Sequence, residues 1–352
     1  DKKMCMKTCD FFEAFINLLR DGDDCMNAFD KYIPICFLVK GICLADGNIE
    51  QGKALIKKAH QFNIKVIMDM VFNHTAPDSI LFKEHPEFYF YKNGKPGNRV
   101  GDWTDIIDLD TSKKGTQDYL MKVLRYWREL GVDGFRFDVA SLIPLSFFKR
   151  ARKALGKKVI FIGESVEDSF VHYLKKNGIK TTPDKDMYPT FDILYNYNWF
   201  PELMTYVKGG DYMPLINKLK LQEETMPKNY IRVNCLDNHD NARIAELLQQ
   251  NPLKLKEILN FVYFIKGCTF VYMGDEFGNA HKPELFEKDP VDWTFVDNDL
   301  KDWYETLIKE KANPFNNKIV KQTFTVMDDN KVKVELVNNK GATKVRVFDF
   351  GL

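Results

Sequence analysis

The sequence has almost no net charge and no long apolar run, and both absences narrow the range of functions. It contains 51 lysine and arginine residues against 50 aspartate and glutamate residues, a net charge of +1. This balance predicts no nucleic-acid partner, because proteins that bind nucleic acids concentrate positive charge. No stretch approaches the roughly 18 consecutive apolar residues that a transmembrane helix needs, so no membrane partner is expected either.

The cysteines lack the pattern of a disulfide framework or of a common metal site. Their number is seven, which is odd, they form no CxxC pair, and no histidine precedes His60. In a chain of this size we interpret them as reduced thiols. The N-terminal segment is charged and lacks the apolar region and cleavage site of a signal peptide. Both observations lead us to expect a cytoplasmic location.

Short apolar runs alternate with amphipathic segments from about residue 50 onward. Residues 51–62 and 119–130 carry apolar side chains at helical spacing, whereas 64–74 and 132–140 are short runs typical of buried strands. Similar pairs continue as far as the run at 268–276. This alternation predicts an α/β fold with a parallel sheet covered by helices. Its length and repeat count favour a TIM-type (β/α)8 barrel over an open sheet.

Two segments interrupt the alternation. Residues 75–115 are polar, aromatic and turn-rich, which predicts an inserted subdomain after the third strand. Residues 311–352 alternate at period two between turn signals, which predicts a small C-terminal antiparallel β domain. The barrel would then comprise residues 1–74 and 116–310. Only one strand, around residues 33–39, is readable before residue 60, so the N-terminal strands are diverged or incomplete.

Polar side chains follow four of the predicted strands at the points where the strands end. The segments are DMVFNH at 69–74, GFRFD at 134–138, GES at 163–165 and DNHD at 237–240. In a β/α barrel the carboxyl ends of the strands meet at one face, where active sites are built. Arg136 and Asp138 point the same way, because they are two residues apart on a strand.

Carboxylates that converge on one pocket suit the hydrolysis of a glycoside. One carboxylate attacks the anomeric carbon, while another protonates the leaving oxygen and then acts as a base toward water. Further carboxylates stabilise the positive charge that develops on the sugar. An arginine beside the attacking carboxylate lowers its pKa and keeps it ionised. A purely structural ion pair between Arg136 and Asp138 is the alternative, and Glu164 and Asp240 weigh against it.

The four segments, in this order and at these spacings, resemble the four signature segments of the α-amylase family of glycoside hydrolases. The segments IIDLD at 106–110 and CTFVYMGDE at 268–276 are similar to two further motifs of that family. The resemblance covers roughly residues 45–310. It implies a retaining double displacement in which Asp138 is the nucleophile, Glu164 the general acid/base and Asp240 the stabiliser of the transition state.

The same resemblance implies substrate-binding and metal-binding residues. The implied substrate-binding residues are Arg136, His74 and His239, with Asp69 as an acid that supports them. In many family members an Asn and an Asp at the positions of Asn73 and Asp108 hold calcium, an ion that prefers oxygen ligands. Four aromatic residues are candidate sugar platforms, with core or interface packing as the alternative for each: Trp103, Trp199, Phe90 and Tyr91.

The sequence departs from the family pattern in two places. Ser141 and Leu142 stand where the family often has Lys and His, and the N-terminal region lacks the Gly-Tyr-Asp segment whose tyrosine stacks on the sugar. The resemblance implies action on α-1,4-linked glucans or maltooligosaccharides. A 4-α-glucanotransferase or α-glucosidase of the same family is an alternative. A non-catalytic amylase-like binding protein with a defective N-terminal barrel is the alternative from another class.

Overall fold

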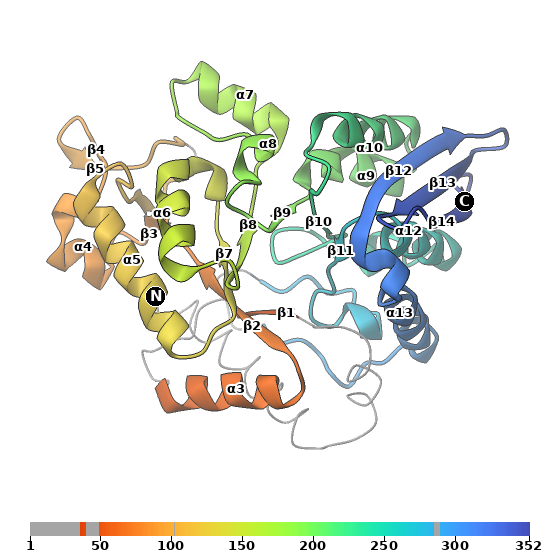
Figure 1. The fold of residues 1–352 in the computed structure, drawn as a ribbon, viewed down its shortest axis with the longest axis horizontal. Helices are drawn as coiled ribbons and strands as arrows, with labels where there is room; N and C mark the ends of the chain where they lie inside the picture. The colour runs from red at the N-terminus through yellow and green to blue at the C-terminus, as the bar shows by residue number, and fades with distance from the viewer. Residues whose placement is uncertain (1–35, 40–48, 102, 285–288) are drawn as a thin grey trace. The chain divides into compact units, whose positions relative to one another are not determined.

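The computed structural model describes residues 36–39, 49–101, 103–284 and 289–352 (Figure 1). The described chain divides into two compact units, one ending at Leu194 and the other running from Tyr195 to Leu352. Within the described ranges, no helix is both long enough and apolar enough to cross a bilayer. The chain segments on either side of the predicted strand at 33–39, including the place of the missing Gly-Tyr-Asp segment, lie outside the described residues.

The first unit is built on parallel strands, which confirms the predicted α/β alternation. In sheet order these strands are β1 (Cys36–Val39), β2 (Lys65–Met70), β7 (Gly134–Phe137), β8 (Ile160–Gly163) and the start of β9 (Ile193–Tyr195). Met70 pairs with Phe137, and Phe137 pairs with Gly163. The carboxyl ends of β2, β7 and β8 are therefore level, and the residues that follow them start from one edge.

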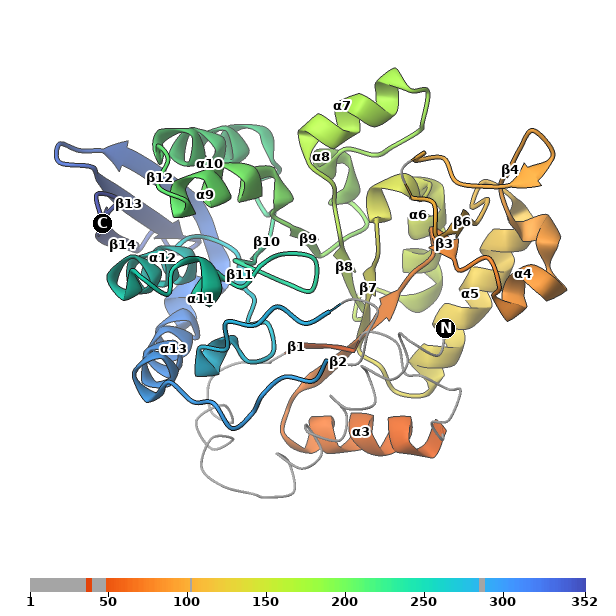
Figure 2. The same ribbon diagram turned by 180° about the vertical axis from the view of Figure 1, so that it is seen from behind.

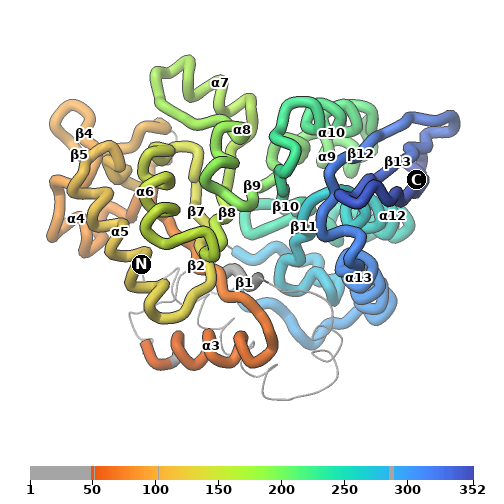
Figure 3. Tube along the Cα trace, in the orientation of Figure 1, coloured from red at the N-terminus to blue at the C-terminus, as the bar shows by residue number. Residues whose placement is uncertain are grey.

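Helices connect these strands, and the apolar periodicity predicts those before β2, β7 and β8 but not the two that follow β8. They are α3 (Ile49–Gln61), α5 (Lys114–Glu129), α6 (Leu145–Leu155), α7 (Asp168–Lys176) and α8 (Asp184–Met187). Figure 3 follows the alternation from β2 in orange to β8 in green. Aromatic packing holds α6 to the sheet, because the Phe137 ring of β7 lies 5.0 Å from the Phe148 ring of α6. The Phe137 ring also lies 5.1 Å from the Phe161 ring of the neighbouring strand β8.

The segment between β2 and α5 contains only short elements. They are β3 (His74–Thr75), α4 (Ile80–Glu84), the 3-10 turn Pro86–Phe88, β4 (Tyr91–Lys92), β5 (Lys95–Pro96) and β6 (Ile107–Asp108). Strand β3 pairs with β6 and β4 with β5, both antiparallel. This pattern agrees with an insertion into the β/α alternation. That the insertion forms a subdomain over residues 75–115 stays a prediction.

The second unit combines parallel strands, helices and an antiparallel sheet. Its elements are the 3-10 turn Tyr197–Trp199, α9 (Phe200–Val207), α10 (Met213–Thr225), β10 (Arg232–Asn234), α11 (Ile244–Leu247), α12 (Pro252–Phe264), β11 (Cys268–Thr269), the 3-10 turn Asp275–Phe277, α13 (Asn298–Lys311), the 3-10 turn Pro314–Lys318, β12 (Ile319–Val326), β13 (Lys331–Asn338) and β14 (Thr343–Asp349). Strands β12, β13 and β14 form the antiparallel C-terminal sheet that the period-two pattern predicts.

Alternation along β13 explains how this sheet packs. Val332, Val334 and Leu336 are fully buried, and both ribbon views show the sheet beside α12 (Figures 1 and 2). The Phe261 ring of α12 lies 5.3 Å from the Phe348 ring of β14.

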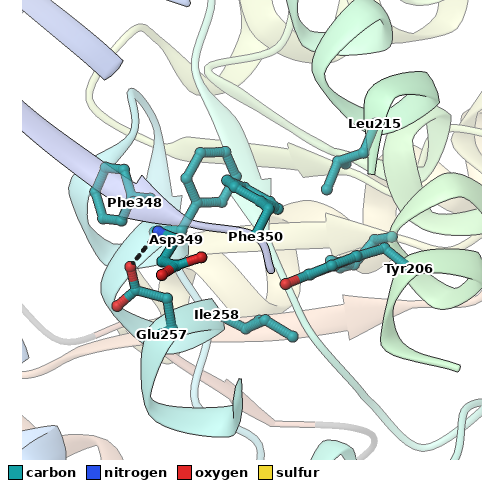
Figure 4. Close-up of a pocket in the computed structure, with 9 residues that line it drawn as sticks. Tyr206, Leu215, Glu257, Ile258, Phe348, Asp349 and Phe350 are labelled. Atoms are coloured by element: carbon teal, nitrogen blue, oxygen red, sulfur yellow. Dashed lines mark hydrogen bonds between the residues drawn. The ribbon is translucent and has the colours of Figure 1, made fainter. Parts of the chain in front are cut away.

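A small apolar pocket marks the same junction. Tyr206, Leu215 and Phe350 line it with residues of α12, and the Asp349 N–H donates to Glu257 at 2.8 Å (Figure 4). Cys235 and Cys268 of this unit are free thiols, as expected.

Gly134 at the start of β7 is expected to tolerate no side chain. A Cβ atom there would lie 2.3 Å from the Ile160 carbonyl oxygen and 2.8 Å from the side chain of Ile67. Overpacking of this kind costs typically about 1–3 kcal/mol, so Gly134→Ala should lower the free energy of unfolding by at least that amount in urea denaturation. Gly101→Ala is the matched control, since no atom lies within 4 Å of its added Cβ. Equal stability of the two variants would contradict the close packing of β7 and β8.

Candidate active site

Arg136 is a fully buried cation near the level ends of β2, β7 and β8. A buried guanidinium requires anionic partners, because leaving it unpaired away from water is very costly. Its Nη1 donates to Asp69 Oδ1 at 3.0 Å and to Asp138 Oδ1 at 2.7 Å. Its Nη2 lies 2.7 Å from Glu164 Oε1. One arginine thus joins three of the predicted site carboxylates.

Backbone hydrogen bonds fix the two carboxylates that follow the strands. The Asp138 N–H donates to Met70 O at 3.1 Å, and the Glu164 N–H donates to Phe137 O at 3.0 Å. Each bond extends the parallel ladder one residue beyond the strand. The side chains of Asp138 and Glu164 are 16% and 11% exposed, whereas that of Asp69 is only 1% exposed. The first two side chains are thus partly accessible to solvent, whereas Asp69 is buried against Arg136.

Val139 directs the second oxygen of Glu164. Its φ and ψ angles are 41° and 43°, in the left-handed region that a β-branched residue rarely adopts. In this conformation the Val139 N–H donates to Glu164 Oε2 at 2.9 Å. Backbone strain of this kind persists where the surrounding structure enforces it, often at functional sites. Both oxygens of Glu164 are therefore oriented, one by Arg136 and the other by Val139.

His74, Asn73 and Asp108 meet at the short ladder between β3 and β6. His74 pairs with Asp108 across the ladder, and Asn73 O accepts the Leu109 N–H at 2.8 Å. Asp108 is 1% exposed, and its Oδ2 accepts the Arg99 backbone N–H at 2.8 Å and Arg99 Nη1 at 3.2 Å. Burial raises the pKa of Asp108 above its ordinary value, against the opposing bonds from Arg99.

The donor set around Asp108 is small for calcium. This ion takes six to eight oxygen ligands, and Asn73 and Asp108 supply two side chains. Asp108 Oδ1 is buried without a hydrogen-bond partner in the described part of the chain, but Arg99 already occupies Oδ2. No group of three or more His, Cys, Asp or Glu residues suited to a metal occurs among the described residues. These residues do not by themselves fit a calcium site.

The segment DNHD belongs to the second unit, where Asn238 organises it. Asn238 Oδ1 accepts the Asp240 N–H at 2.9 Å, and its Nδ2 donates to the Tyr197 hydroxyl at 2.7 Å. The side chains of His239 and Asp240 lie 3.1 Å apart and are 22% and 47% exposed. Both predicted site residues of this unit are therefore accessible at a turn that is fixed by side-chain bonds.

Two buried carboxyl groups, those of Asp237 and Asp275, lie close to this turn in the sequence or in its hydrogen-bond network. Asp237 Oδ2 accepts the Ile244 N–H at 2.7 Å, and Arg243 Nη1 donates to Asp275 Oδ1 at 2.7 Å. Burial raises the pKa of both Asp237 and Asp275, and the negative charge of Asp237 raises the pKa of Asp275 further. Two neighbouring buried carboxyl groups with one arginine between their charges are more stable with one of them protonated than with both ionised. Arg243, three residues beyond Asp240, is a supporting residue that the motif analysis missed.

Arg99, rather than a metal ion, is expected to balance the charge of Asp108. Arg99→Met would leave a buried carboxylate unpaired and should lower the free energy of unfolding by about 1–3 kcal/mol. Lys95→Met, which alters an exposed cation in the same segment, is the control. A chelator should leave the melting temperature of the unaltered protein unchanged. A clear fall in melting temperature on chelation, reversed by calcium, would contradict this expectation.

Comparison with known proteins identifies the family. The family model described as "Alpha amylase, catalytic domain" matches residues 42–331. The crystal structure of an α-amylase from Lactobacillus plantarum is 32% identical, with 82% of this chain and 69% of that one covered and a TM-score of 0.77. A maltogenic α-amylase from Thermotoga neapolitana is 30% identical over 83% of this chain and 68% of its own, with a TM-score of 0.69.

Curated relatives agree with this result. Alpha-amylase 3 of Dictyoglomus thermophilum is 24% identical over 74% of this chain and 56% of its own length. The cyclomaltodextrinase of Thermoanaerobacter pseudethanolicus is 26% identical over 66% of this chain and 42% of its own. The chain thus spans about half the length of the curated relatives it matches. The structural likeness confirms the predicted TIM-type barrel class, and the chain belongs to the α-amylase family of glycoside hydrolases.

Proposed function

We propose that the chain hydrolyses α-1,4-linked glucans or maltooligosaccharides with retention of configuration. The observation that carries this proposal is the pair of accessible carboxylates, Asp138 and Glu164, held on one buried arginine. Retaining glycosidases need two carboxyl groups near the same glycosidic bond. The names of the relatives, among them α-amylases and a cyclomaltodextrinase, support this substrate class.

In the first step Asp138 attacks the anomeric carbon while the bond to the leaving oxygen breaks. Glu164 must enter the step protonated, so its ion pair with Arg136 Nη2, 2.7 Å long in this structure, has to loosen when the substrate binds. It then gives its proton to that oxygen, and a covalent glycosyl ester forms on Asp138. The positive charge of Arg136, 2.7 Å from Asp138, suits a carboxylate that must attack in its ionised form. Burial of Arg136 keeps this charge strong, because little water screens it.

In the second step water replaces the leaving group. Glu164, now ionised, takes a proton from the water, whose oxygen attacks the anomeric carbon and releases Asp138. Asp240 would stabilise the positive charge on the sugar in both steps, and His74 and His239 would bind its hydroxyl groups. A sugar hydroxyl that attacks in place of water would give glucan transfer, which is the alternative within the family.

Substitution of the two carboxylates tests the assignment. Asp138→Asn removes the nucleophile, and Glu164→Gln removes a proton transfer that contributes about 10²–10⁴-fold to the rate, so kcat on maltoheptaose should fall by at least that factor in each. Glu129→Gln, on the exposed end of α5, is the matched control and should retain full activity. NMR of the fresh product should show the α-anomer first.

Three outcomes separate the alternatives. Full activity in Asp138→Asn, or a β-anomeric first product, would sink the proposed mechanism. Products longer than the substrate, formed from maltotriose, would replace hydrolysis by glucan transfer. Saturable binding of maltoheptaose by the unaltered protein without turnover would favour a non-catalytic binding protein.

A further inference from the structure

A row of aromatic rings in the first unit runs outward from His74. The ring centroids of His74 and Trp103 are 6.1 Å apart, and those of Trp103 and Phe170 are 6.4 Å apart. The next pair, Phe170 and Tyr173, is 5.9 Å apart and stacked at an interplanar angle of 10°. We call Trp103, Phe170 and Tyr173 the aromatic track. It joins the segment inserted after β2 to helix α7.

Core packing does not account for the track. Helix α7 buries Val171 and Leu174, which are 7% and 0% exposed, against the rest of the unit. Phe170 and Tyr173 lie one position before these two, at i and i+3, so they share a neighbouring stripe of the helix. Tyr173 is 44% exposed, and Phe170 and Trp103 are partly exposed. A contiguous set of exposed rings often marks a binding surface, because apolar area in water is unfavourable.

The other aromatic candidates differ from the track. Trp199 is fully buried in the core of the second unit. Phe90 lies under the Arg99 guanidinium, 4.6 Å from its ring centroid, and so has a structural partner. Tyr91 on β4 is 42% exposed, but it is not one of the rings that follow His74. Trp103 is the candidate from the sequence that belongs to the track. Phe170 and Tyr173 were not singled out, although their i, i+3 spacing is a signal that could have suggested a shared face.

The track begins at the same edge of the sheet as the Arg136 cluster. His74 follows β2, and α7 begins four residues after Glu164, beyond the end of β8. Because β2, β7 and β8 end level, both connections leave the edge that carries Asp138 and Glu164. Figures 1 and 2 show α7 and α8 following β8 at that edge. A ligand chain that lies across this edge can continue along the track.

Aromatic faces match the chemistry of a glucan chain. A pyranose ring has a flat face of C–H groups, which packs on an aromatic ring, and hydroxyl groups around its rim. Trp and Tyr supply large rigid contact areas at a low cost in conformational entropy. Exposed polar side chains flank the rings on α7, among them Ser169 and His172, and are available to the hydroxyl groups. Such a mixture of rings and few polar groups is usual for small-ligand sites.

We propose that the aromatic track binds successive glucose units of an α-glucan chain beyond the reacting sugar, so that it sets the preference for chain length. For its substrate class this proposal rests on the proposed function. Trp103 contacts the sugar nearest to His74, and Tyr173 contacts the most distant one. Long oligosaccharides use all three rings, whereas short ones reach only Trp103.

Binding measurements on the full chain test the track. They use the Glu164→Gln background, in which the ligand is not consumed, with maltotriose and maltoheptaose as ligands in calorimetric titrations. Tyr173→Ala should weaken maltoheptaose binding roughly 5–10-fold, as expected for the loss of one aromatic contact, and leave maltotriose unaffected. Trp103→Ala should weaken the binding of both ligands by a similar factor, and Tyr173→Phe should restore binding because it keeps the ring.

The control is Tyr126→Ala, an equally exposed aromatic residue on α5 whose ring packs on Trp127. It should change neither affinity. Two results would contradict the proposal that the aromatic track binds the glucan. One is an unchanged maltoheptaose affinity in both Trp103→Ala and Tyr173→Ala, and the other is an equal loss of affinity in Tyr126→Ala. If the unaltered protein hydrolyses maltoheptaose but the track substitutions leave its affinity unchanged, only this inference fails. If the track binds maltoheptaose but the unaltered protein hydrolyses nothing, only the proposed function fails.

Discussion

The burial of one guanidinium group governs the site in the first unit. Arg136 has no exposed side-chain surface, and its charge must be met inside the protein. Asp69, Asp138 and Glu164 meet it from three adjacent strands or the residues just after them. Strand register and carboxylate geometry therefore depend on each other: a shift of one residue in β2 or β8 would turn a carboxylate away and leave the arginine unpaired.

Strand β7 serves the core and the site at once. Phe135 and Phe137 occupy one face and pack among other aromatic rings, while Arg136 lies between them on the opposite face. Gly134 allows β8 to approach closely, which keeps the ends of the strands level. The apolar face thus fixes the position of the charged face. A rigid support of this kind suits chemistry that needs two carboxyl groups at a set separation.

Local patterns were sufficient to predict the parallel strands, some of the helices, such as α3 and α5, and the Arg136–Asp138 pair. Apolar runs mark buried strands, and the i, i+2 spacing alone places Arg136 and Asp138 on one face. The left-handed Val139 was not predictable, because a β-branched residue disfavours that conformation and only the contact with Glu164 reveals it. The bond from Arg99 to Asp108 and the track across Trp103 and Phe170 depend on contacts between distant segments, which leave no periodic signal.

In the proposed mechanism Asp138, held by Arg136, forms the covalent bond to the sugar. The most direct test is mass spectrometry of the protein after reaction with a fluorinated maltosyl fluoride. The glycosyl ester that this reagent leaves on the enzyme forms quickly and is hydrolysed slowly, so it can be detected. After digestion, we expect one added maltosyl group on the peptide that contains Asp138. A maltosyl group on any other carboxylate, or hydrolysis of the reagent through an inverted product without a trapped ester, would contradict the mechanism.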